Sequence, residues 1–236
     1  MNTKGLVDSR NKDLWDLINK EYTCSIEYIT DTQEYGCFTK NNTAILYVPK
    51  SSINPDSFTH ELLHIYIRMK QVFIGSSLKS NITSNPRLNK FYSLPLIEHI
   101  GNCLDHIKML PLYLAMGYKR ELFIQDYNLT KCSNEEIQNL QNYFQFGPSY
   151  NGSAIDLFIG KIFAIRACPN NEIDYRSKLI ALKKINSALF EINQNLIDDW
   201  IQLDIDVNDP LELGYIGLVL DYCDRMNEWC TGKIII

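Results

Sequence analysis

The sequence predicts an α+β protein that is mostly helical, with a small N-terminal β-sheet and a C-terminal helical bundle. β-branched and aromatic residues dominate three short segments before residue 50, which is typical of strands. From residue 55 onward, apolar residues recur at steps of three and four, which is typical of helices. A chain of 236 residues with 45% hydrophobic content can bury a substantial core. We expect a core over residues 1–125 and a helical region over residues 126–236 that packs on it.

The N-terminal part begins with a short helix at residues 10–20, where Leu14, Trp15 and Ile18 form an apolar stripe. Three predicted strands follow, and Lys40-Asn41-Asn42 is the expected hairpin turn between the second and the third. The strands are expected at residues 22–31, 33–39 and 43–49. We expect their sheet to be antiparallel at least in part.

The next helix is predicted over residues 55–73. Asn54 can cap it, Pro55 fits its first turn, and Asp56 suits the positive end of the helix dipole. It is expected to stop near Gly75 and to pack on the sheet through an apolar stripe of Phe58, Leu62, Ile65, Met69 and Val72.

The chain beyond this helix is predicted to be a long loop followed by further helices. The loop is expected at residues 76–93 because they are rich in Ser, Asn and Lys. The next helix opens at Ser93 and ends near Leu110, before Pro111. The remaining helices are expected at residues 133–144, 152–166, 172–200 and 209–229.

Within the helix at 55–73, residues 60–64 read His-Glu-Leu-Leu-His, which is the HExxH pattern. Residues i and i+4 lie on one helix face, so His60 and His64 can direct two imidazoles at one ion. Glu61 is placed to take a proton from a water bound to that ion. A zinc ion held in this way lowers the pKa of its water to about 7 and polarises a carbonyl. The pattern therefore predicts a Zn²⁺ site suited to amide hydrolysis.

A catalytic zinc usually has three protein ligands, so the following helix should supply the third. At about 100° per residue, Glu98, Asn102 and Asp105 share one edge of that helix. We favour Glu98 as the metal ligand, with Asn102 placed to hydrogen-bond a histidine of the first helix. His99, Asp105 and His106 are the alternatives.

These residues resemble the IrrE/ImmA-like zinc metallopeptidases over roughly residues 20–118. The resemblance rests on the strand ending in Tyr-Val-Pro, the HExxH helix, and a later helix with Glu98, Asn102 and Pro111, since the proline lies nine residues after the asparagine. It implies a zincin-like core in which His60, His64 and Glu98 bind the metal. It also implies that Glu61 is the catalytic base.

We therefore expect a zinc metallopeptidase that acts on a protein or peptide substrate. One alternative is a non-catalytic zinc-binding module that binds a regulatory protein partner. Another is a structural zinc site closed by a fourth ligand such as His99 or His106. The intact Glu61 favours the enzyme, because a scaffold does not need the base.

Composition argues against several other classes. The net charge of −5 argues against a nucleic-acid-binding surface. There is no apolar run long enough for a membrane span, and residues 1–20 are too polar for a signal peptide. The seven cysteines are odd in number and form no CxxC pair, so free thiols and a cytoplasmic location are expected.

Overall fold

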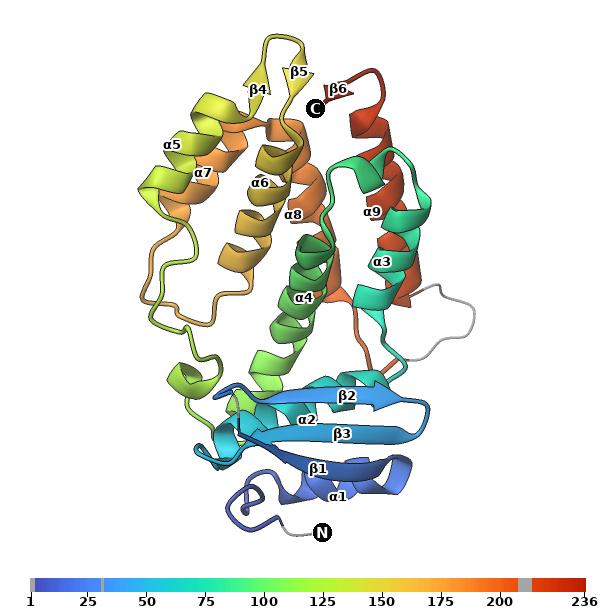
Figure 1. Ribbon diagram of the computed structural model, residues 1–236, viewed down its shortest axis with the longest axis vertical. Coiled ribbons are helices and arrows are strands. Elements are labelled where there is room, and N and C mark those ends of the chain that lie inside the picture. Colours follow the sequence, from blue (N-terminus) through green and yellow to red (C-terminus); the bar gives the residue numbers. More distant parts are fainter. Residues whose placement is uncertain (1–2, 31, 208–213) are drawn as a thin grey trace. The chain divides into compact units, whose positions relative to one another are not determined.

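The computed structural model describes residues 3–30, 32–207 and 214–236 (Figure 1). The chain is α+β, as predicted, and it divides into two compact units. Unit 1 comprises Met1–Val72 and Lys108–Asn128, and unit 2 comprises Phe73–Ile107 and Leu129–Ile236. This division differs from the expected boundary near residue 125, because residues 73–107 group with the C-terminal part of the chain.

Unit 1 contains a mixed three-stranded sheet that follows helix α1 (Lys12–Glu21). The strands are β1 (Thr23–Ile29), β2 (Gly36–Lys40) and β3 (Thr43–Pro49), in the order β1-β3-β2. β3 pairs in parallel with β1 and antiparallel with β2, which confirms the expected partly antiparallel sheet. A two-residue turn joins β2 to β3, and Asn41 adopts a φ of 51° there, a conformation that asparagine tolerates better than most residues.

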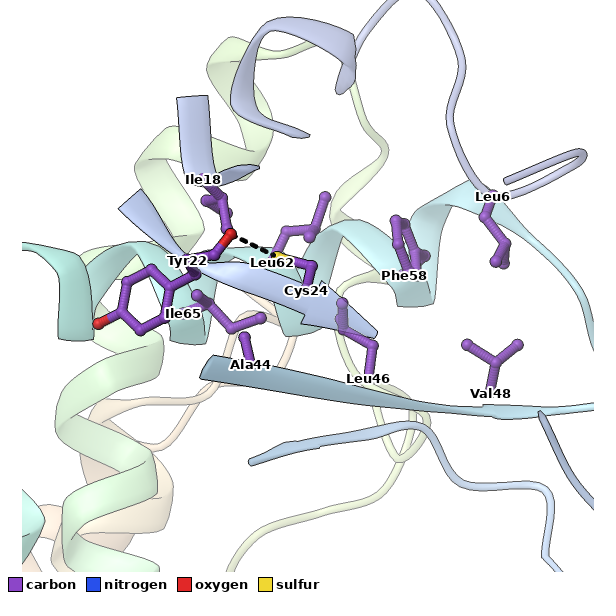
Figure 2. Packing of buried hydrophobic residues seen from close by; sticks show 10 residues of the cluster. All are labelled: Leu6, Ile18, Tyr22, Cys24, Ala44, Leu46, Val48, Phe58, Leu62 and Ile65. Atoms are coloured by element: carbon purple, nitrogen blue, oxygen red, sulfur yellow. Dashed lines mark hydrogen bonds between the residues drawn. The ribbon is translucent and has the colours of Figure 1, made fainter. Parts of the chain in front are cut away.

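The core of unit 1 lies on one face of this sheet. Alternate residues of β3, namely Ala44, Leu46 and Val48, are buried, as period-two alternation requires for a sheet covered on one side. They pack against α1 and against helix α2 (Pro55–Met69). Figure 2 shows the cluster, in which α2 contributes Phe58, Leu62 and Ile65. This confirms three positions of the predicted stripe, each worth roughly 1.5–3 kcal/mol of burial.

The start of α2 is as predicted, but its end is not. The Asn54 side chain accepts a hydrogen bond from Ser57 N at 2.8 Å, with Pro55 in the first turn. The helix ends at Met69 and not near Gly75, because Gln71 takes a φ of 60°. Gln71 N donates to Arg68 O and Val72 N to Ile67 O, which is the Schellman arrangement usually built on glycine.

The loop predicted at residues 76–93 is wrong, because most of it is helical. Helix α3 spans Ile74–Ser84, and a short 3-10 turn η1 spans Leu88–Lys90. Ile74, Leu78 and Ile82 recur every four residues and are fully buried. This apolar spacing outweighs the polar composition of the segment.

Helix α4 runs from Leu94 to Ala115 without interruption, so the predicted end before Pro111 is also wrong. A proline inside a helix removes the backbone hydrogen bond to the residue four earlier, here Ile107. α4 starts in unit 2 and belongs to unit 1 from Lys108 onward. The short 3-10 turn η2 (Arg120–Leu122) follows it in unit 1.

The rest of unit 2 is largely helical. α5 (Asn134–Tyr143) begins with a capping box between Ser133 and Glu136, and α6 spans Gly152–Arg166, as predicted. The single helix predicted at 172–200 is in fact two, α7 (Arg176–Ile185) and α8 (Ser187–Gln202). Asn186 lies between them, and its side chain accepts from Leu189 N.

The last helix, α9, spans Gly214–Cys230, and its predicted start at residue 209 lies outside the described residues. A small sheet is formed by β4 (Gln145–Phe146), β5 (Ser149–Tyr150) and β6 (Ile234–Ile235). Within the described ranges, the helices are all too short or too polar to cross a membrane.

Candidate metal and catalytic site

His60 and His64 lie one turn apart on α2, and their rings are neighbours. The ring centroids are 5.1 Å apart in an edge-on arrangement. The His60 ring also packs on Phe123, with centroids 4.8 Å apart, and Phe123 packs in turn on Tyr113 of α4. The structure of unit 1 therefore confirms the prediction that these two histidines share one face of α2.

His106 of α4 joins these two histidines. One side-chain nitrogen from each of the three lies within 4.8 Å of the others, and all three residues are partly buried. His106 stands two residues before Lys108, where α4 enters unit 1.

Glu98, the third ligand favoured from the sequence, is not a member of this group. It precedes His106 by eight residues on α4, or about 12 Å along the helix axis. Its side chain is 68% exposed, and one carboxylate oxygen lies 3.5 Å from Lys79 Nζ. The third ligand that the structure offers is instead His106, one of the alternatives left open by the sequence.

The other two alternatives lie elsewhere on α4. His99 contacts the carbonyl oxygen of Gly160 at 3.3 Å and the Cys103 thiol at 3.5 Å through Nε2, within unit 2. Asp105 is buried, with 1% of its surface exposed, and is not part of the group either.

The three histidines fit a first-row divalent metal. Three imidazoles are a known catalytic zinc ligand set, and they leave the fourth tetrahedral position open. At zinc–nitrogen distances of 2.0–2.1 Å, bound nitrogens would lie roughly 3.4 Å apart. The observed separation of up to 4.8 Å is therefore within about 1.5 Å of that spacing, a difference that side-chain rotation can close.

The electrostatics of His60 also suit a metal ligand. Burial, together with the neighbouring His64, lowers the pKa of His60 to about 3. The ring is therefore neutral at physiological pH, as a metal ligand must be. Its Nδ1 atom is buried and accepts no hydrogen bond, while the ring interacts with the backbone of Phe123.

Glu61 follows His60 on α2 and is buried, with 9% of its surface exposed. Burial raises the pKa of its carboxyl group, while His64 and a hydrogen bond from the Cys37 side chain act in the opposite direction. A buried carboxylate with a raised pKa beside a candidate metal-binding pair has the properties expected of a general base.

A hydrogen-bond network braces the helix turn that carries His60. Asn11 is fully buried, and its Nδ2 donates to Thr59 Oγ1 at 2.8 Å and to Leu6 O at 2.9 Å. Thr59 Oγ1 donates in turn to Pro55 O. The N-terminal segment thus holds the residue next to His60, and no sequence motif indicated this contact.

The chain was compared with protein-family models, with curated proteins and with solved structures, and none of these comparisons finds a match.

Proposed function

We propose that this chain is a zinc-dependent peptidase that hydrolyses peptide bonds of a protein substrate. The single observation that carries the proposal is the meeting of His60, His64 and His106 beside the buried Glu61. Three protein ligands with an open fourth position favour a catalytic site over a structural one.

His60, His64 and His106 would hold the metal, and a zinc ion bound there supplies a water with a pKa of about 7 and polarises the scissile carbonyl. Glu61 removes the proton from the attacking water and passes it to the leaving amine. Its raised pKa suits this second role, because the carboxyl group must keep the proton between the two transfers.

The resemblance to the IrrE/ImmA-like zinc metallopeptidases is part of this proposal and rests on the sequence motifs alone. The ligand set proposed here departs from the one that the resemblance implies, because His106 takes the place of Glu98. The HExxH helix and its glutamate keep the same roles in both.

The test measures zinc content and cleavage of labelled casein for the wild-type protein and Glu61→Gln. We expect the variant to retain one zinc and to lose cleavage by roughly 100-fold or more, as expected for loss of a general base. Glu27→Gln, on an exposed position of β1, is the matched control and should match wild type. Undiminished cleavage by Glu61→Gln would remove Glu61 from the mechanism.

A second experiment distinguishes the enzyme from a non-catalytic zinc-binding regulator. The zinc-loaded wild-type protein is incubated with candidate partner proteins, and the mixtures are analysed by mass spectrometry. An enzyme yields fragments, whereas a regulator binds its partner and leaves it intact.

A further inference from the structure

The edge strand β2 presents a thiol to the helix that carries the candidate site. β2 is at one edge of the sheet, and Cys37 pairs with Leu46 of β3 in the register. Directly paired residues point to the same face of a sheet. Leu46 is buried in the core that α2 covers, so Cys37 also points toward α2.

The Cys37 side chain reaches Glu61. It is partly buried against the core cluster of unit 1 and makes a side-chain hydrogen bond with the Glu61 carboxylate. A carboxylate only accepts, so the thiol is the donor. A buried carboxylate requires such donors, since an unsatisfied one is costly.

We propose that Cys37 is a positioning residue for Glu61, in which the thiol binds one carboxylate oxygen and leaves the other free to take the proton from water. The inference rests on the proposed peptidase function. A general base must lie within hydrogen-bond reach of the proton that it removes. An S–H donor on the far oxygen limits rotation of the carboxylate and so keeps the near oxygen in place.

The first test compares Cys37→Ala with Cys37→Ser in the zinc-loaded protein, with casein cleavage as the measurement. We expect Cys37→Ala to lower kcat by about 10-fold or more, as outer partners of catalytic groups typically do, with KM and zinc content unchanged. Cys37→Ser restores a donor and should recover most of the rate.

The matched control is Cys24→Ala. Cys24 is a buried thiol of β1 in the same core, and it contacts the Tyr22 carbonyl oxygen. Its removal tests the loss of core volume without the contact to Glu61. Equal rates for Cys37→Ala and Cys24→Ala, or no rescue by Cys37→Ser, would overturn the proposal.

A second test does not depend on activity. The S–H stretching band of Cys37 is identified in the infrared difference spectrum between wild type and Cys37→Ser. We expect Glu61→Gln to shift this band, because an amide is a weaker acceptor than a carboxylate. An unshifted band would overturn the contact even if casein is cleaved. A shifted band without casein cleavage would leave the contact standing and reject the peptidase function.

Discussion

The two units differ in the kinds of polar group that they bury. In unit 2, Tyr92 and Tyr222 share a hydrogen bond between their hydroxyl groups at 2.6 Å, and the Tyr222 hydroxyl donates to Asn193 Oδ1 at 2.9 Å. Asn193 Nδ2 donates to Leu189 O at 2.7 Å, and all three side chains are buried. Protein groups satisfy one another there, as is usual in protein interiors.

In unit 1, the candidate site buries an imidazole and a carboxyl group in place of neutral hydroxyl and amide groups. The pKa of His60 is lowered and that of Glu61 is raised, so burial opposes the charged form of both. Burial of ionisable groups lowers the stability of the folded state, and groups with shifted pKa values cluster at functional sites. The hydroxyl network of unit 2 therefore serves structure, as does the contact between Asn11 and Thr59 in unit 1. We propose that the buried side chains of His60 and Glu61 serve chemistry instead.

The largest expected effect concerns the third metal ligand. We expect His106→Ala to weaken zinc binding by more than about 100-fold, beyond the loss typical of outer partners. Glu98→Ala should leave zinc affinity unchanged, since Glu98 is exposed beside Lys79. Competition with a zinc chelator measures both. Loss of zinc in Glu98→Ala with retention in His106→Ala would restore Glu98 as the ligand.

The contrast between His60, His64 and His106 shows what the sequence could and could not predict. The pair on α2 follows from local rules, because Asn54 and Pro55 set the helix start and the i, i+4 spacing sets the shared face. The grouping of His106 with this pair joins residues that are far apart in the sequence, and periodicity along α4 does not reveal it.

The errors in the fold have similar causes. The polar residues of α3 obscure the four-residue spacing of Ile74, Leu78 and Ile82 in the sequence. α2 ends before Gly75 because Gln71, a non-glycine residue, takes the left-handed conformation. α7 and α8 are separate helices because Asn186 caps the start of α8, a weak signal inside a long apolar pattern. In each case a weak local signal needed tertiary contacts to decide it.

The second largest expected effect is a loss of stability of the metal-free protein in acid. The pKa of His60 is about 3 in the folded state and about 6.5 in an unfolded chain. The unfolded state therefore binds more protons between these values, so stability falls as pH decreases below about 6.5. We expect a loss of a few kcal/mol by about pH 4, measured by urea unfolding after chelation.

His60→Asn isolates this contribution, because the variant removes the titrating ring. The stability of the variant should depend less on pH between about pH 6.5 and pH 4. An unchanged pH dependence would show that other groups cause the acid sensitivity and that the ring of His60 is more accessible to protons than the structure indicates.

A smaller effect is expected in unit 2. Tyr222→Phe removes the hydroxyl that links Tyr92 to Asn193, and it leaves buried polar atoms without that partner. We expect a loss of about 1–3 kcal/mol in the free energy of unfolding, with zinc affinity unchanged. Thermal and urea unfolding measure the loss. A variant that also loses zinc would contradict the assignment of this hydroxyl network to structure alone.

The smallest effect has the opposite sign. Burial raises the pKa of Glu61 in the folded state, so its ionised form disfavours folding once the pH exceeds the unfolded value of about 4.3. Glu61→Gln removes that charge at similar volume, and we expect the metal-free variant to be more stable at neutral pH, by less than the loss expected for Tyr222→Phe. The gain should vanish near pH 4, where the wild-type carboxyl group is protonated in the folded state and largely protonated in the unfolded state.

Urea unfolding at both pH values checks this, with Glu27→Gln as the exposed control. A variant less stable than wild type at neutral pH would mean that the ionised Glu61 gains more from its contacts than burial costs it, which would place this carboxylate among the structural groups and remove the contrast with unit 2.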